Sequence, residues 1–275
     1  KGGHSGMDII LGRGNANKSM VRVLLPLIKE LGARVASIEG GSLRNAIPRE
    51  AFAVLALPKS KEAAAMKIVE EHLAGMKFEL SAQDPDVNVT LVPCETPAKV
   101  IDAKTALNAV LAVYACPNGV ERMSDAVPGL VETSNNLAIV KSENGVIAVK
   151  CLMRSSVDSA KDMLGASLSS VFELAGAKVE LTGGYPGWKP DMNSAILSTM
   201  KDVYKKLYGT EPKVMAIHAG LECGILGGTY PNWDMISCGP TIRSPHSPDE
   251  RVNIQTVDKW WNYVVEVLKA APVKK

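Results

Sequence analysis

A histidine bracketed by prolines and followed by two carboxylates is the segment of this sequence best suited to chemistry. It is His246, in the run Ser-Pro-His-Ser-Pro-Asp-Glu. Proline fixes φ and removes a backbone donor, so Pro245 and Pro248 hold the imidazole in a stiff turn, as a metal ligand requires. One histidine is far short of a metal site, however, and an inert surface turn explains the segment equally well.

Two of the other three histidines also lie in loop-like, glycine-rich surroundings. His4 lies in the run Lys-Gly-Gly-His-Ser-Gly, and His218 begins the run His-Ala-Gly-Leu-Glu-Cys-Gly. His72 instead lies inside a helical pattern, where a solvated or half-buried histidine is the default. We therefore interpret His72 as structural and keep the other three as candidates for a site.

Composition excludes several classes of partner. The chain has 275 residues, is 46% hydrophobic and carries a net charge of +2 with no basic stripe, and only 5% of its residues are aromatic. With this composition, the chain offers nucleic acid neither a continuous basic surface for the phosphates nor enough aromatic residues to stack on the bases. No apolar run approaches the roughly 18 residues of a membrane span, and no signal peptide opens the chain. Five scattered cysteines without a CxxC pair indicate a reducing, cytoplasmic location.

The periodicities predict two successive α-β-β-α-β units over residues 1–184, each an antiparallel sheet with helices on one face. The expected elements of the first unit are a helix over 15–31, strands over 34–38 and 50–57, a helix over 61–76 and a strand over 87–92. Those of the second are a helix over 102–115, strands over 136–140 and 145–152, a helix over 158–175 and a strand over 178–181. An Asn-Gly pair should close the second hairpin, because it accepts positive φ.

A Gly/Pro/Trp-rich segment over 183–190 marks a domain boundary. The expected elements beyond it are a helix over 193–208, strands over 213–217 and 235–237, and a terminal helix over 256–270. This is the back half of an α/β domain, so we expect residues 185–275 to lack a partner segment. The sequence also opens on a glycine-rich motif without an initiator methionine, and we expect its true start to be missing.

Five motifs in order resemble one known family, the cytosolic Xaa-His dipeptidases (aminoacylhistidine dipeptidases, peptidase D). They are the runs over 1–6, 12–16, 45–48, 218–224 and 244–250. The family belongs to the two-zinc aminoacylase and carboxypeptidase group, in which a lid or dimerisation domain is inserted into a zinc-binding α/β catalytic domain. The resemblance implies that residues 1–184 are the two-lobed lid and residues 185–275 the C-terminal part of the catalytic domain. It also implies a homodimer through the lid.

The resemblance implies the roles of two histidines. His246 matches the last zinc ligand, which Asp249 or Glu250 would orient. His4 matches a lid histidine that stabilises the oxyanion of the tetrahedral intermediate, in some enzymes in a partner subunit's site. The alternative for His4 is a histidine that merely caps the glycine turn.

The resemblance also implies residues that contact the dipeptide substrate. Asn45, and Asn135 or Asn136 in the second lobe, resemble lid asparagines of this kind, although Asx-turn roles fit equally well. Arg154 lies where related enzymes grip the substrate carboxylate, which suits a guanidinium fork. The residues after it also read as an ordinary helix N-terminus, so this role stays open.

His218 and Glu222 are expected on a loop facing the site, where they could contact the dipeptide. Glu222 is not interpreted as the general base, because that residue comes from an upstream Glu-Glu pair in the family. That pair, the His-x-Asp motif and two further aspartate ligands have no counterpart in this sequence. We therefore expect the intact protein to hydrolyse dipeptides through a zinc-activated water, with manganese or cobalt as possible substitutes, and this chain alone to be inactive.

Two alternatives stay open. In the first, the chain is a non-catalytic lid, dimerisation or peptide-binding module, because its two-lobed region is complete while the catalytic part is not. In the second, it is an unrelated α/β binding protein whose motifs match by chance.

Overall fold

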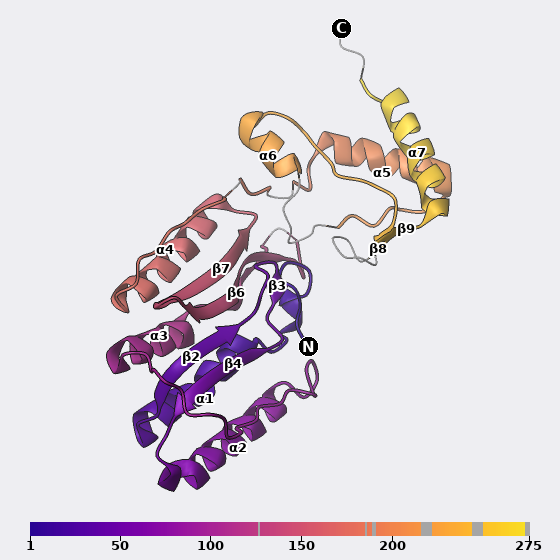
Figure 1. Ribbon diagram of the computed structural model, residues 1–275. Coiled ribbons are helices and arrows are strands. Elements are labelled where there is room, and N and C mark those ends of the chain that lie inside the picture. Colours follow the sequence, from indigo (N-terminus) through magenta and orange to yellow (C-terminus); the bar gives the residue numbers. More distant parts are fainter. Residues whose placement is uncertain (126, 185, 189–190, 216–221, 244–249, 273–275) are drawn as a thin grey trace. The chain divides into compact units, whose positions relative to one another are not determined.

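The computed structural model describes residues 1–275 apart from 126, 185, 189–190, 216–221, 244–249 and 273–275. The chain divides into two compact units, of which the first comprises residues 1–184 (Figure 1). The second contains the helices and strands that follow. Among the described residues, no helix is both long and apolar enough to cross a membrane.

The first unit is built on one antiparallel sheet of five strands. The strands are β2 (Arg34–Gly40), β4 (Ala51–Ala56), β5 (Gly119–Met123), β6 (Val131–Glu143) and β7 (Val146–Ser155). Their order is β4-β2-β6-β5, and β7 pairs with β6 as well. The two lobes therefore share a continuous sheet, because β2 pairs with β6 through Glu39↔Lys141 and Gly40↔Val140. The expected mixed α/β fold with antiparallel strands is confirmed.

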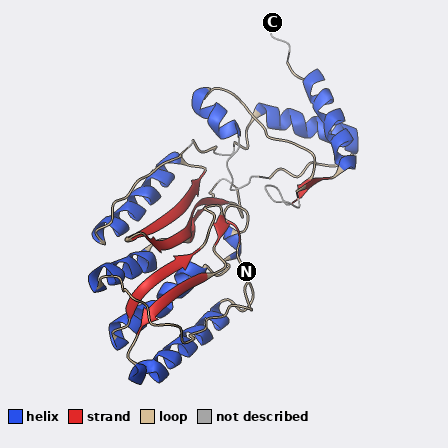
Figure 2. Cartoon of the chain, viewed as in Figure 1, coloured by secondary structure: helices blue, strands red, loops and turns tan. Residues whose placement is uncertain are grey.

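Three helices pack on one face of this sheet, and a fourth packs on the first of them (Figures 1 and 2). The four are α1 (Ala16–Leu31), α2 (Glu62–Glu79), α3 (Ala103–Ala115) and α4 (Asp158–Leu174). The main core joins α1, α3 and α4 to the sheet, with Leu24, Val35, Val110, Leu137 and Leu164 fully or almost fully buried. A second cluster joins α1 to α2. Each lobe thus begins and ends with a helix and places strands of the sheet between them, as the periodicity predicts, although the second lobe has β5 as an additional strand.

Local signals explain why α1 and the β6–β7 hairpin form where they do. The side chain of Asn15 accepts the backbone N–H of Lys18 at 3.2 Å and caps the N-terminus of α1. Gly32 caps the other end, and its own backbone is in the left-handed conformation. The hairpin turns through Asn144 and Gly145, with φ of 53° and 79°. Both residues take the positive φ that the Asn-Gly pair predicts.

Two predicted strands, over 87–92 and 178–181, are wrong, since these segments pair with no strand. In the first, Val87, Val89 and Leu91 pack against the α1–α2 cluster. Their period of two therefore reports side-chain burial rather than strand pairing. Strand β5 was missed because it is a short strand whose residues are mostly exposed.

The second unit is small and mostly helical. Its elements are α5 (Ala195–Tyr208), α6 (Glu222–Thr229), β8 (Ile242–Arg243), β9 (Arg251–Val252) and α7 (Ile254–Lys269). Tyr263 packs α7 on α5 and donates its hydroxyl to the carbonyl of Met200 at 2.8 Å. The strand predicted over 235–237 is absent, as is any strand over 213–215, the described part of the one predicted over 213–217. Helix α6 and the β8–β9 pair were not predicted.

Candidate active-site loop around His4

Strand β1 (Gly3–His4) carries the candidate histidine and pairs with β3 (Ala46–Ile47). The register places His4 opposite Ala46 and Gly3 opposite Ile47. Gly3 has φ of 151°, and a Cβ there would lie 2.4 Å from the Arg13 guanidinium. The glycine run is therefore required for this close approach.

The imidazole of His4 is fixed by its own loop. Its Nδ1 accepts the backbone N–H groups of Gly6 and Met7, each at 3.1 Å. An Nδ1 that accepts hydrogen bonds carries no proton, so in the neutral ring the proton is on Nε2. The turn-capping interpretation of His4 thus accounts for one ring nitrogen, and the other is the hydrogen-bond donor.

Charged side chains bind the backbone of the strand that carries His4. The backbone N–H of His4 donates to Asp8 Oδ2 at 2.8 Å, and that carboxylate lies 3.4 Å from Arg13. Arg13 also donates to the carbonyl of Gly2 at 2.6 Å. This bracing holds β1 in place from the side opposite β3.

Asn45 and Asn136 meet at this loop. Asn45 is exposed in the turn before β3, and its carbonyl accepts the N–H of Ser5 at 2.8 Å. Asn136 is buried on β6, and its Nδ2 donates to the carbonyls of Arg44 at 3.0 Å and Ala46 at 2.8 Å. Asn136 therefore binds the backbone on both sides of Asn45.

Asn135 is equally buried but points to another part of the fold. Its Nδ2 donates to the carbonyl of Pro117 at 2.7 Å, after α3. Neither Asn135 Oδ1 nor Asn136 Oδ1 has a hydrogen-bond partner among the described residues. A substrate contact by either residue stays a prediction, while both amide nitrogens are engaged with backbone.

A cluster of asparagines around β6 was not found from the sequence. The β6–β7 register shifts between Leu137 and Ile139. The carbonyl of Leu137 accepts the side-chain amides of Asn15 at 3.0 Å and Asn17 at 3.3 Å. Such a bulge leaves backbone groups unpaired, and here asparagines satisfy them. The only sequence signal was an asparagine at each end of the Asn-Ala-Asn run at the start of α1.

The remaining candidates lie apart from this loop or outside the described residues. Arg154 is half-buried on β7 opposite Ser134. Ser155 accepts the N–H of Val157 at 3.1 Å, and Val157 is the residue before α4, whose N-terminus has no side-chain cap. Glu222 is exposed at the start of α6, in the second unit. His218, His246 and Asp249 lie outside the described residues.

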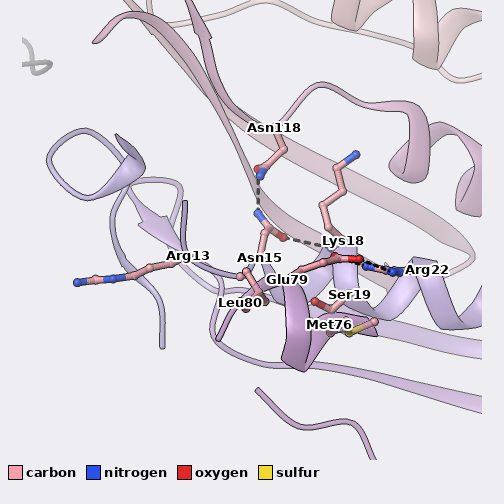
Figure 3. A pocket seen from close by; sticks show the side chains of 10 residues that line it. Arg13, Asn15, Lys18, Ser19, Arg22, Met76, Glu79, Leu80 and Asn118 are labelled. Carbon is pink, nitrogen blue, oxygen red and sulfur yellow. Dashed lines mark hydrogen bonds and ion pairs between the residues drawn. The ribbon is translucent and has the colours of Figure 1, made fainter. Parts of the chain in front are cut away.

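A pocket of about 210 Å³ lies at the N-terminus of α1 (Figure 3). Arg22 donates to both oxygens of Glu79, at 2.6 and 2.8 Å, and this pair raises the pKa of Arg22 and lowers that of Glu79. Lys18 donates to the carbonyls of Val113, Tyr114 and Cys116, and burial lowers its pKa. The charged groups lining the pocket are thus already engaged within the protein.

The described residues contain no group of three or more His, Cys, Asp or Glu side chains arranged to hold a metal ion. The predicted ligand His246 is not among them. The described part of the chain therefore does not supply a zinc site by itself.

Comparison with known proteins finds similarity to peptidases. Residues 1–81 match a family model described as a peptidase dimerisation domain. The cytosol non-specific dipeptidase of Escherichia coli (strain K12) is 42% identical over 274 residues, which are 100% of this chain and 56% of that protein. The crystal structure of aminoacylhistidine dipeptidase from Vibrio alginolyticus matches with a TM-score of 0.92 and 46% identity, covering 100% of this chain and 56% of that one.

The chain is thus a mixed α/β protein whose residues 1–81 match the model of a peptidase dimerisation domain. The resemblance to the cytosolic dipeptidases of the aminoacylhistidine type is confirmed, and the chain is related to them over its whole length. The chain spans about half the length of the relatives it matches.

Proposed function

We propose that this chain is part of a metal-dependent dipeptidase that hydrolyses Xaa-His-type dipeptides through a zinc-activated water. The observation that carries the proposal is the match of the entire chain to two dipeptidases, at 42% and 46% identity. A fold alone does not define a function, but similarity at this level over a whole chain supports a shared one.

His4 would act as a hydrogen-bond donor to the reacting carbonyl. As the scissile bond is attacked, negative charge develops on the carbonyl oxygen, and a positioned donor stabilises that charge in the transition state. The two backbone N–H groups on Nδ1 support this role, because they leave Nε2–H as the donor. Arg154 would bind the free carboxylate of the dipeptide, which a guanidinium can contact through both oxygens.

Zinc is the proposed metal, with manganese or cobalt as possible replacements. When bound, it would polarise the carbonyl and activate the attacking water. His246 is the one ligand that the resemblance assigns to this chain. The remaining ligands and the general base would come from a catalytic segment that this sequence does not contain, so the chain alone would be inactive.

The second unit supports the proposal of a missing segment. Helix α7 exposes large apolar residues at helical spacing, including Ile254 at 79%, Trp261 at 60% and Leu268 at 68% exposure. An apolar helical stripe of this kind normally packs against another part of a protein. We propose that the N-terminal catalytic segment covers it, that residues 185–275 are the C-terminal part of the catalytic domain, and that residues 1–184 are a lid.

The lid would also form the dimer interface of a cytoplasmic homodimer. Support comes from the match of residues 1–81 to a peptidase dimerisation domain and from the cytosolic relative. A non-catalytic lid or peptide-binding module is the second candidate, favoured by the larger core of the first unit.

The test is metal content and hydrolysis of a dipeptide such as β-alanyl-histidine, measured on two proteins. One is this chain alone, and the other is this chain fused behind the N-terminal segment of its Escherichia coli relative. The proposal predicts metal and turnover only in the fusion. Stoichiometric zinc and turnover in the chain alone would show that it is not an inactive part. A folded, dimeric fusion without turnover would favour the second candidate.

A further inference from the structure

We propose that Asn136 is a positioning residue for the His4 loop rather than a residue that touches the substrate. The inference rests on the proposed role of His4 in dipeptide hydrolysis. It begins with the two hydrogen bonds from Asn136 Nδ2, to the carbonyls of Arg44 and Ala46. These carbonyls are two residues apart, so one amide group fixes both ends of the turn that carries Asn45.

This turn is in direct contact with the strand that carries His4. Ala46 is the register partner of His4 in the β1–β3 pair. Next to this pair, the carbonyl of Asn45 accepts the N–H of Ser5. A displacement of the turn would therefore shift the backbone on both sides of the His4 side chain.

The chemistry of asparagine suits this role. Both donors sit on one planar nitrogen, and a single side chain can therefore reach two carbonyls. A carboxylate of the same shape would bring only acceptors to these carbonyls, and an apolar side chain of similar size would leave them without their partner. Asn136 is 1% exposed, so it binds the turn from the interior of the protein, while Asn45 is exposed to solvent.

Apolar packing and hydrogen bonds both hold β3 to the sheet. Ile47 packs with Ile9 and Val131 in a small apolar cluster of its own, separate from the main core. The two hydrogen bonds of Asn136 are thus a substantial part of what anchors this short pair of strands on β6. Loss of either would be felt first at the loop and only weakly in the main core.

The neighbouring asparagine provides a matched control. Asn135 has the same burial and also donates from Nδ2 to a backbone carbonyl, but to Pro117 and not to the β3 turn. Asn136→Leu and Asn135→Leu therefore remove equivalent groups from adjacent positions. Only the first should disturb His4.

The experiment measures amide hydrogen exchange at Ser5, Gly6 and Met7, and the imidazole ¹⁵N shifts of His4, in both variants. For Asn136→Leu we expect the exchange rates of these three amides to rise about tenfold or more, beyond any increase that global unfolding causes. We also expect the ¹⁵N shift of Nδ1 to move away from the value of a hydrogen-bonded acceptor nitrogen. Asn135→Leu should leave both unchanged. Asn136→Ser serves the same purpose if the leucine variant does not fold.

Unchanged exchange and unchanged ¹⁵N shifts in Asn136→Leu would overturn the inference, as would an equal effect of Asn135→Leu. A second experiment measures catalysis. In an active fusion, Asn136→Leu should lower kcat with little change in KM. A disturbed loop with undiminished kcat would confirm the positioning of His4 by Asn136 and refute the proposed catalytic role of His4. Failure of the inference about Asn136 can therefore be distinguished from failure of the proposed role of His4.

Discussion

The side-chain amide of Asn15 donates to the side-chain oxygen of Asn118 at 2.9 Å, across 103 residues of sequence. This contact joins the cap of α1 in the first lobe to the segment between α3 and β5 in the second. The same Asn118 oxygen accepts the N–H of Leu137 at 3.0 Å. The two lobes are thus tied by asparagines at the irregular part of β6, which is also the strand that carries Asn136.

The tight approach of the β2–β3 connection to this strand can be tested at Gly41. Its φ is 71°, and an added Cβ would lie 1.9 Å from the carbonyl oxygen of Ala138. Gly41→Ala should therefore lower the free energy of unfolding by about 3 kcal/mol, from backbone strain and overpacking together. Urea denaturation measures the loss.

Gly32 is the matched control, since its φ is 68° and a Cβ there meets nothing within 4 Å. Gly32→Ala should cost only about 1 kcal/mol, the strain of the left-handed backbone. Equal losses at the two positions would show that the connection is not tightly packed on β6.

The second unit should lose stability in acid through Asp234. Its carboxylate accepts the hydroxyl of Ser194 at 2.6 Å and the N–H of Ile196 at 2.9 Å at the start of α5. The Ser194 hydroxyl and the backbone N–H groups hold the pKa of Asp234 below its ordinary value of 3.8. A folded-state pKa below the unfolded one stabilises the folded state above the unfolded pKa.

This contribution is therefore complete above about pH 4 to 5 and disappears as the pH falls through the lowered folded-state pKa. Asp234→Asn should remove that part of the acid dependence, measured as the urea midpoint of α5 unfolding between pH 2 and pH 7. An identical pH dependence in the variant would contradict the assignment.

The cysteines should differ in reactivity. Cys116 is buried with its sulfur 3.9 Å from that of Cys151, whereas Cys94 and Cys238 are exposed. The hydrogen bond with Cys151 and burial raise the pKa of Cys116, and the same hydrogen bond lowers the pKa of Cys151. Because the two thiols titrate as a pair, the first thiolate should form on Cys151.

Alkylation followed by peptide mass mapping at pH 7 should label Cys94 and Cys238 first and Cys116 last, since reaction needs an accessible thiolate. In Cys151→Ser, the part of the thiolate absorbance that belongs to Cys151 should disappear from the pH titration. Early labelling of Cys116 would mean that the α3–β7 region opens readily.

The exposed stripe on α7 makes a prediction about the missing segment. Trp261 is 60% exposed in this chain, and Trp260 on the neighbouring face is partly buried. Acrylamide should quench the fluorescence of Trp261 in the chain alone, in a variant in which the other three tryptophans, Trp188, Trp233 and Trp260, are replaced by phenylalanine. In the fusion with the catalytic segment, quenching should fall by about half or more, because apolar surface of this kind is covered. Unchanged quenching in an active fusion would place that segment elsewhere.

The sequence predicted the helices of the first unit and the central hairpin well because these elements depend on local signals. The apolar periodicity of α1, the stop at Gly32 and the Asn-Gly turn each act within a few residues. The last strand of each lobe was predicted wrongly because alternation also arises when a chain packs on helices, as Val87 and Val89 show. The single sheet shared by the lobes depends on the long-range β2–β6 pairing, which no local pattern reveals.

The candidate site was predictable to a similar extent. The sequence places His4 in a glycine-rich segment. The structure explains the glycine at position 3, because a Cβ there would collide with Arg13. The role of Asn136 was not predictable, because its partners lie 90 and 92 residues away. Sequence motifs can identify a residue that reacts, whereas the residues that hold it are set by the fold.

The most direct test of the account is the dipeptidase activity of the fusion protein with His4→Gln. Glutamine keeps a donor but not the ring that the N–H groups of Gly6 and Met7 hold in place. If His4 Nε2–H stabilises the oxyanion, kcat should fall about 10²- to 10³-fold with KM changed little. An unchanged kcat, in a variant that folds and binds metal as the parent does, would contradict the catalytic role of this loop.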